Sequence, residues 1–159
     1  MTKYSGHFRN TQWDPFLLVS QIVAMQSVYY VSFGLWLSII GLFTGYTRSL
    51  DLMFKYQDVN IRDYYGVSVI VAITLNAITG SFILWTLIQR TKLCLDFTCT
   101  LHVFHVFFCI YYNNALPTSI LWWIVYIFSC TVMCILGEIL CMRTELKAIP
   151  LNMTPKVHL

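Results

Sequence analysis

The chain has little charge. Only 11% of its 159 residues are Asp, Glu, Lys or Arg, whereas a soluble domain has about 25%. Hydrophobic residues make up 58% of the chain, and its mean hydropathy is +0.67. A soluble domain of this size could not cover so much apolar surface with polar side chains. The composition therefore excludes an ordinary cytosolic enzyme, a disordered linker and a nucleic-acid-binding protein, and it indicates a small integral membrane protein.

The chain also lacks the motifs that mark common catalytic and cofactor sites. It contains no nucleophile elbow, HExxH, phosphate-binding loop or Rossmann glycine pattern. Its six cysteines include no Cys-x-x-Cys pair. The net charge of +3 is too small to imply a polyanionic partner. We therefore expect no enzyme activity, catalytic residue, cofactor, metal, nucleic acid or small-molecule substrate.

Three long stretches without charge show where the chain can cross a bilayer. They lie between Asp14 and Arg48, between Asp63 and Arg90, and between Asp96 and Glu138. One membrane-spanning helix takes about 20 apolar residues, and the third stretch holds two helices separated by the turn signal NNALPT at 113–118. Helices are the default in lipid because their backbone groups are satisfied internally. The sequence predicts an all-α membrane protein with four transmembrane helices in one domain, at about 16–43, 67–88, 93–112 and 119–141.

Lysine and arginine are divided unevenly between the two sides of this arrangement. Seven of the ten lie in the two tails and in the link between the second and third spans, and three lie at 44–66. The positive-inside rule then places both termini in the cytosol, with tails at 1–15 and 142–159 and a lumenal loop at 44–66. The glycosylation sequon at Asn152 would be cytosolic and unused. We also expect a short lumenal helix at 49–54.

Small residues follow one line along the first span, at alternating steps of four and three. The line is Ser20, Ala24, Ser27, Val31, Gly34, Ser38, Gly41 and Gly45, and only Val31 is not small. Such a line lets another helix approach closely. We favour packing against the other three spans over a homodimer. In the second span, Asn76 is expected to hydrogen-bond to another helix.

The third span carries a polar stripe. At 100° per residue, Thr98, His102 and His105 share one helix face with Thr91, Cys94, Cys109 and Tyr112. This face must contact protein or water, because ionisable groups are costly in lipid and are usually functional there. Asp96 is off the stripe, roughly opposite His105.

Asp96 and Glu138 lie at the same cytosol-facing depth in the predicted topology. Three interpretations stay open. The acids pair with Lys92, Arg90 or Arg143 while the histidines hydrogen-bond across helices. Alternatively, the acids line a cytosol-facing notch that holds a partner. In the third interpretation, His102, His105 and an acid form a metal or proton site, although a zinc site needs a third ligand that is not assured.

Several strings of the chain carry a family resemblance. They are the Trp-Asp-Pro at 13–15, the SQIV at 20–23, the KLCLDFT at 92–98, His102 with His105, Trp122 with Trp123, and the run from Gly137 to Leu151. Together they resemble the Sys-one family of Golgi membrane trafficking proteins, over nearly the whole chain. The segment at about 45–65 matches least.

The resemblance implies a multi-pass protein of the trans-Golgi network membrane. Members of that family recruit an Arf-related small GTPase with an acetylated N-terminus and so support vesicle and protein transport between endosomes and the Golgi. Acetylation removes the charge of the amine, and a lone amphipathic helix or lipid chain binds a bilayer weakly, so a receptor supplies a second signal.

The family pattern fixes no binding residue, so the docking site is inferred from geometry. Resembling strings and buried acids coincide at the cytosolic ends of the third and fourth spans. We expect the GTPase helix to contact residues there, namely Asp96, Glu138, Arg143, Glu145 and Lys147. The alternative function is a small transporter or channel that uses the polar stripe of Thr98, His102 and His105.

Overall fold

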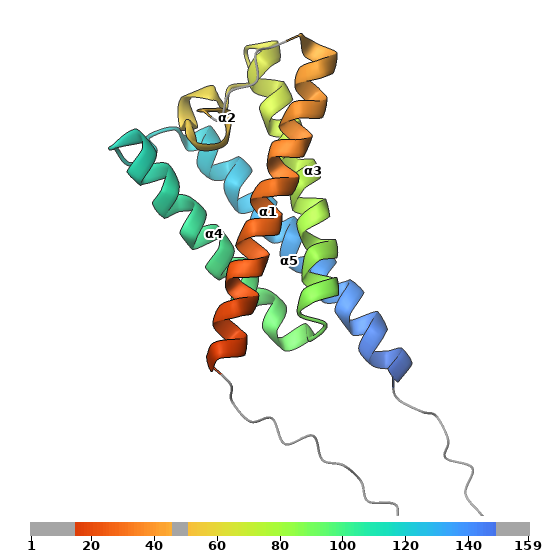
Figure 1. The fold of residues 1–159 in the computed structure, drawn as a ribbon. Helices are drawn as coiled ribbons and strands as arrows, with labels where there is room; N and C mark the ends of the chain where they lie inside the picture. Colours follow the sequence, from red (N-terminus) through yellow and green to blue (C-terminus); the bar gives the residue numbers. More distant parts are fainter. Residues whose placement is uncertain (1–14, 46–50, 149–159) are drawn as a thin grey trace, which may run out of the picture.

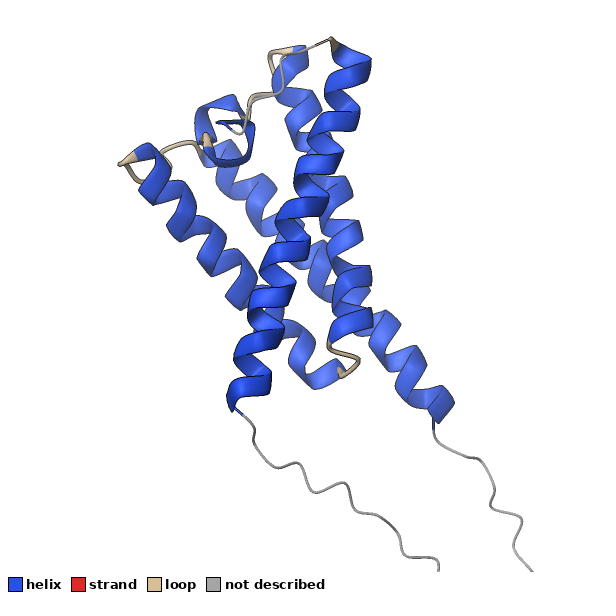
Figure 2. Ribbon diagram, in the orientation of Figure 1, coloured by secondary structure: helices blue, strands red, loops and turns tan. Residues whose placement is uncertain are grey.

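Four long apolar helices run the length of the structure (Figure 1). They are α1 (Pro15–Thr44), α3 (Tyr64–Leu87), α4 (Thr91–Asn113) and α5 (Ile120–Ala148). The structure is a computed structural model, and it describes residues 15–45 and 51–148. Each of the four helices is long and apolar enough to cross a membrane, and the described residues form no strand (Figure 2). The predicted all-α fold with four spans is confirmed.

The hairpin of α4 and α5 shows where the span limits expected from hydropathy differ from the observed ends of the helices. α4 ends at Asn113, and its C-cap residue Asn114 has a φ of 50°, the left-handed conformation common at helix C-termini; both residues lie within the predicted turn. α5 runs on to Ala148, beyond the predicted span end at 141. Residues 142–148, here called the α5 extension, are therefore helical. Of the predicted tails at 1–15 and 142–159, residues 1–14 and 149–159, with Asn152, lie outside the described residues.

The two ends of the bundle differ. α1 begins and α5 finishes at one end, called here the terminal end (Figure 1). At the other end, called the cap end, the short helix α2 (Asp51–Phe54) and a 3₁₀ turn, η1 (Tyr56–Asp58), lie across the bundle. α2 covers the second part of the short helix expected at 49–54, and residues 49 and 50 lie outside the described residues.

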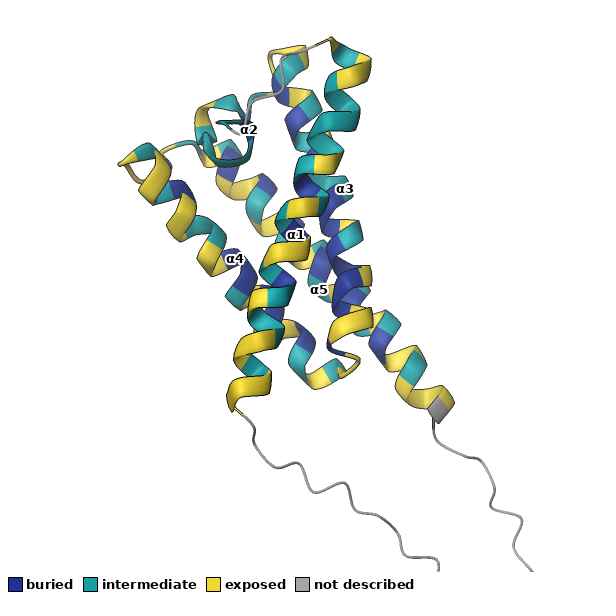
Figure 3. Ribbon diagram, viewed as in Figure 1, coloured by how far each residue is buried: buried dark blue, intermediate teal, exposed yellow. Residues whose placement is uncertain are grey.

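α3 is the central helix. It packs against both α5 and α1, α4 packs chiefly against α5, and α1 has little contact with α4. The buried positions gather on α3 (Figure 3), where Ala72, Ala77 and Ser81 are fully buried. A Cβ atom added to Gly80 would lie 2.8 Å from Sδ of Met133 on α5. Small side chains on α3 thus let α5 cross it at close range.

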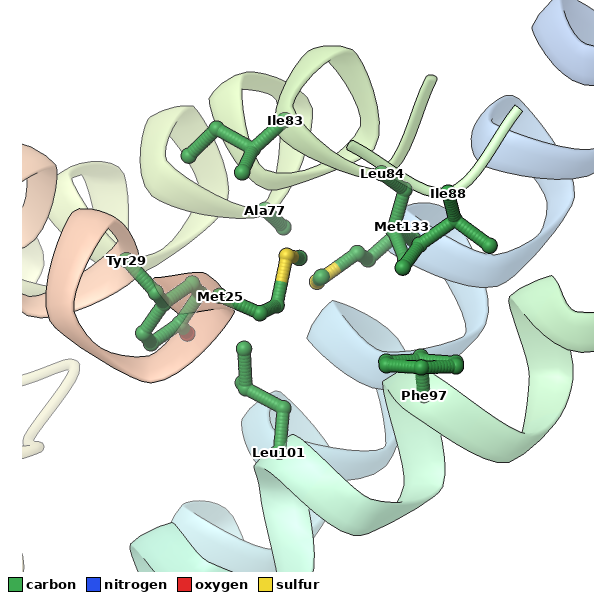
Figure 4. Packing of buried hydrophobic residues seen from close by; sticks show 9 residues of the cluster. All are labelled: Met25, Tyr29, Ala77, Ile83, Leu84, Ile88, Phe97, Leu101 and Met133. Carbon is green, nitrogen blue, oxygen red and sulfur yellow. The ribbon is translucent and has the colours of Figure 1, made fainter. Parts of the chain in front are cut away.

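Two clusters of buried apolar side chains form the core. The first occupies the middle and terminal half of the bundle (Figure 4): Met25, Tyr29, Ala77, Ile83, Leu84, Ile88, Phe97, Leu101 and Met133. The second lies beneath α2 at the cap end: Leu52, Val59, Val69, Cys109, Trp122 and Val125. Each cluster contains residues from several helices. The core therefore places the polar groups of α4 between the two clusters.

The line of small residues on α1 does not pack as expected over its first half. Ser20, Ser27 and Val31 are exposed, whereas the buried residues of α1 are Met25, Tyr29 and Phe33 on a different face. The predicted packing of this line against the other spans is therefore wrong between Ser20 and Val31. The physical reason is that lipid tails cover small and apolar residues without penalty, so the larger side chains of α1, which make more van der Waals contacts, take the inner face.

Candidate functional site

The five residues expected to contact a partner all lie toward the terminal end. Asp96 is on the second turn of α4 and is exposed, so the expectation that both acids are buried is wrong for Asp96. Glu138 is half-buried on α5, and Arg143, Glu145 and Lys147 are exposed on the α5 extension. The structure therefore brings these residues to the same end of two neighbouring helices.

Glu145 makes a specific contact within the chain. Its carboxylate accepts hydrogen bonds from the backbone N–H of Thr91, at 3.1 Å, and from Oγ1 of Thr91, at 2.7 Å. Thr91 begins α4, so Glu145 satisfies a donor of the first helical turn that has no partner within the helix. Next to it, the indole N–H of Trp85 on α3 donates to Oγ1 of Thr144 at 2.7 Å. These contacts fasten the α5 extension to α3 and α4.

The acids of α4 and α5 do not form the ion pairs that one interpretation required. In the ranges 15–45 and 51–148, the one ion pair joins Lys55 to Asp51, with the nitrogen and oxygen atoms 2.9 Å apart. Glu138 accepts a long hydrogen bond from the thiol of Cys134, at 3.7 Å. The charges of Asp96 and Glu138 are therefore not matched by Arg90, Lys92 or Arg143 in the described part of the chain.

Thiols line the seam between α4 and α5. Cys94 and Cys141 are fully buried, with their sulfur atoms 3.4 Å apart, and both are free thiols. Within the described ranges, no three side chains of His, Cys, Asp or Glu are grouped closely enough to hold a metal ion. The third interpretation, a metal held by the histidines and an acid, gains no support from this geometry.

The polar stripe of α4 lies against the bundle. Thr98 and His102 are buried, and His105 is half-buried. Nδ1 of His102 lies 2.9 Å from the carbonyl oxygen of Thr98. His105 contacts the hydroxyl of Tyr30 on α1 at 3.2 Å through Nδ1 and the thiol of Cys109 at 3.6 Å through Nε2.

Two side-chain hydrogen bonds join α1 to α3. Ser32 donates to Oδ1 of Asn76 at 2.5 Å, which confirms that Asn76 hydrogen-bonds to another helix. Trp36 donates to Oγ1 of Thr79 at 2.9 Å. The sequence shows each polar residue but not its partner, because the partners are more than 40 residues apart.

The cap is fastened to the end of α4. The carboxylate of Asp51 accepts hydrogen bonds from Lys55 and from the hydroxyl of Tyr112, and Asn113 donates to the carbonyl oxygen of Phe54 at 2.7 Å. The hydrogen bond with Asp51 raises the pKa of Lys55, because it stabilises the charged ammonium. These residues place a charged, hydrogen-bonded cap over the second core cluster.

Four apolar spanning helices, joined by polar contacts and capped at one end, define a small multi-pass integral membrane protein. Its α5 extension displays charges at the opposite end. The chain belongs to the SYS1 family, whose description is integral membrane protein S linking to the trans Golgi network, with residues 8–151 matched. This is a family of membrane trafficking proteins and not a known enzyme family, and the resemblance drawn from the sequence strings is confirmed.

Relatives in distant organisms support the assignment. The chain is 41% identical over 145 residues to a SYS1 homolog of Nematostella vectensis, covering 91% of this chain and 92% of the relative. It is 33% identical over 145 residues to a homolog of Dictyostelium discoideum, covering 91% and 62% of the two chains. Identity to Protein SYS1 of Saccharomyces cerevisiae is 26% over 140 residues, covering 85% and 66%. No solved structure matches the chain.

Proposed function

We propose that this chain is a receptor in the trans-Golgi network membrane that recruits an Arf-related small GTPase with an acetylated N-terminus. It thereby supports vesicle and protein transport between endosomes and the Golgi. The proposal starts from membership of the SYS1 family, whose description links it to the trans Golgi network. One structural observation carries the docking role, namely the exposed, unpaired charges at the terminal end.

The terminal end combines charge with apolar area. Asp96, Arg143 and Lys147 are exposed, and Met142 and Leu146 on the α5 extension are 47% and 62% exposed. An apolar helix with a neutral, acetylated end can cover the apolar positions, while charges on the partner pair with those of the receptor. Glu145 has a different role in this scheme, because its contact with Thr91 holds the α5 extension in place.

The proposal requires the terminal end to face the cytosol, with both termini there and the cap in the lumen. The distribution of lysine and arginine supports this orientation. The polar stripe of α4 gives less support to a transporter or channel, because Nδ1 of His102 and both ring nitrogens of His105 have partners within the bundle.

Recruitment can be tested by replacing the endogenous protein with variants and measuring the GTPase on Golgi membranes. Asp96→Asn and Glu138→Gln each remove one unpaired charge without changing side-chain size. We expect each to lower recruitment about two- to five-fold, which corresponds to about 0.4–1 kcal/mol for a partly exposed charge contact. Asp58→Asn, at the cap end, is the matched control and should recruit normally.

Two results would contradict the proposal. If removal of the chain leaves the GTPase on the Golgi, the receptor role is wrong. If Asp96→Asn and Glu138→Gln reach the Golgi at normal levels and recruit fully, the receptor role can stand but this docking surface is wrong.

A further inference from the structure

A small cavity of about 30 Å³ lies among α1, α3, α4 and α5, beneath the cap. Its polar walls are Tyr29, Lys55, His102, His105, Tyr126 and Ser129. One water molecule needs about 10–15 Å³ of such space, so the cavity has room for about two. It is too small for an organic ligand, since such pockets span about 300–1,000 Å³.

His102 sets the chemistry of this cavity. Its side chain is only 3% exposed. A carbonyl oxygen can only accept, so the contact between Nδ1 and the oxygen of Thr98 requires the proton to sit on Nδ1. In the neutral ring, Nε2 then carries a lone pair and needs a donor. Nε2 is buried and has no hydrogen-bond partner among the described residues.

Among the other polar walls, the ammonium of Lys55 is paired with Asp51, while the residues with hydroxyl groups are Tyr29, Tyr126 and Ser129. A molecule that donates to Nε2 must therefore be small, and it can also accept hydrogen bonds from these hydroxyl groups. Water has this chemistry, and buried waters typically make about three such bonds.

One wall of the cavity belongs to a residue that also meets solvent. Lys55 lines the cavity, and its side chain is 42% exposed at the cap end. His105 lies on the same wall, but its ring nitrogens contact the hydroxyl of Tyr30 and the thiol of Cys109. The two histidines should therefore differ in their access to water.

We propose that this cavity is a hydration site inside the membrane-spanning bundle, in which water donates a hydrogen bond to Nε2 of His102 and exchanges with the aqueous phase beside Lys55. The site is independent of the docking surface at the terminal end. The water supplies a hydrogen bond to His102 that no described side chain provides. Through this water, protons from the aqueous phase at the cap reach the ring of His102 and no deeper point of α4.

Solid-state NMR of the full chain, labelled with ¹⁵N-histidine and reconstituted in phosphatidylcholine vesicles, tests the proposal. His102→Gln and His105→Gln identify the two ring signals by their disappearance. We expect His102 to show a protonated Nδ1 and an unprotonated Nε2. Magnetisation from water protons should reach the ring of His102 several-fold faster than the ring of His105.

A second variant tests the cavity itself. Val125→Phe adds a ring at the cavity wall and should slow water transfer to His102 to the level of His105 while leaving the tautomer unchanged. If Val125→Phe does not fold, the wild-type spectra still decide. A protonated Nε2 on neutral His102, or equal and slow water transfer to both rings in the wild type, would overturn the proposal.

Discussion

Replacing Gly80 by valine should force α3 and α5 apart. A Cβ atom at this position would already lie 2.8 Å from Sδ and 3.1 Å from Cε of Met133, which is fully buried. Valine adds two further carbons beyond that Cβ. Overpacking of a well-packed core costs about 1–3 kcal/mol, so Gly80→Val should destabilise the bundle by about 2–3 kcal/mol.

The same contact predicts a compensating pair. Met133→Ala alone should cost about 2–5 kcal/mol, because it leaves a cavity beside Gly80. The double variant exchanges side-chain atoms across the contact, since valine brings three heavy atoms and the Met133→Ala change removes three. Volume-conserving exchanges cost less than about 1.5 kcal/mol. The double variant should therefore be more stable than either single variant, with a coupling energy of about 2 kcal/mol or more.

Reversible unfolding in mixed detergent micelles, followed by tryptophan fluorescence, measures these free energies. Val71→Leu, on the exposed face of the same helix, controls for added volume and should be neutral. If Gly80→Val matches the wild type, or if the double variant loses the sum of the two single losses, α5 does not cross α3 at Gly80 and the reasoning is refuted.

Three further predictions concern other contacts. Asn76→Ala should cost about 0.5–1.7 kcal/mol in the same unfolding assay, because it removes the acceptor of the hydrogen bond from Ser32. Gly66→Ala should make the cap end more sensitive to limited proteolysis, because a Cβ there would overlap the backbone of Asn60 and displace that segment. Arg62→Thr creates a glycosylation sequon at Asn60, and the expected topology predicts an added glycan that endoglycosidase removes.

Each of these has its own control. Ser32→Ala combined with Asn76→Ala should cost no more than the larger single change, and full additivity would show that the two residues do not interact. Normal proteolysis of Gly66→Ala would show that the close approach to Asn60 is wrong. A glycan on Asn152 of the wild-type chain would reverse the proposed orientation.

The course of the four helices could be predicted because lipid is their solvent. A charge inside a span is costly, so the charge-free stretches show where helices cross. The end of α5 could not be predicted in this way, since hydropathy stops at the first charges after 141 while the helix does not. Its continuation is held by Thr144 and Glu145, whose partners Trp85 and Thr91 lie more than 50 residues earlier.

The facing of each helix was predictable only in part. The polar stripe around His102 had to face inward, because the alternative was lipid. The small residues on α1 are under no such constraint, because lipid tails cover Ser27 or Val31 without penalty. The larger Met25 and Tyr29 lie in the interior instead. The cavity at His102 is lined by all four long helices and the cap, and the periodicity of a sequence holds no information about which helices meet.

The central place of α3 has a consequence for biosynthesis. Asn76 and Ser81 are completely buried on a helix that packs against both α1 and α5, and α5 ends at Ala148. At about 5–20 residues per second, the ribosome needs roughly 4–15 seconds to complete α5 after Asn76 has been made. During that interval α3 can pack against α1, but its contacts with α5 are incomplete. The membrane insertion machinery must therefore shield the side of α3 that faces α5, or retain the first two spans near the translocon, until the last helix arrives.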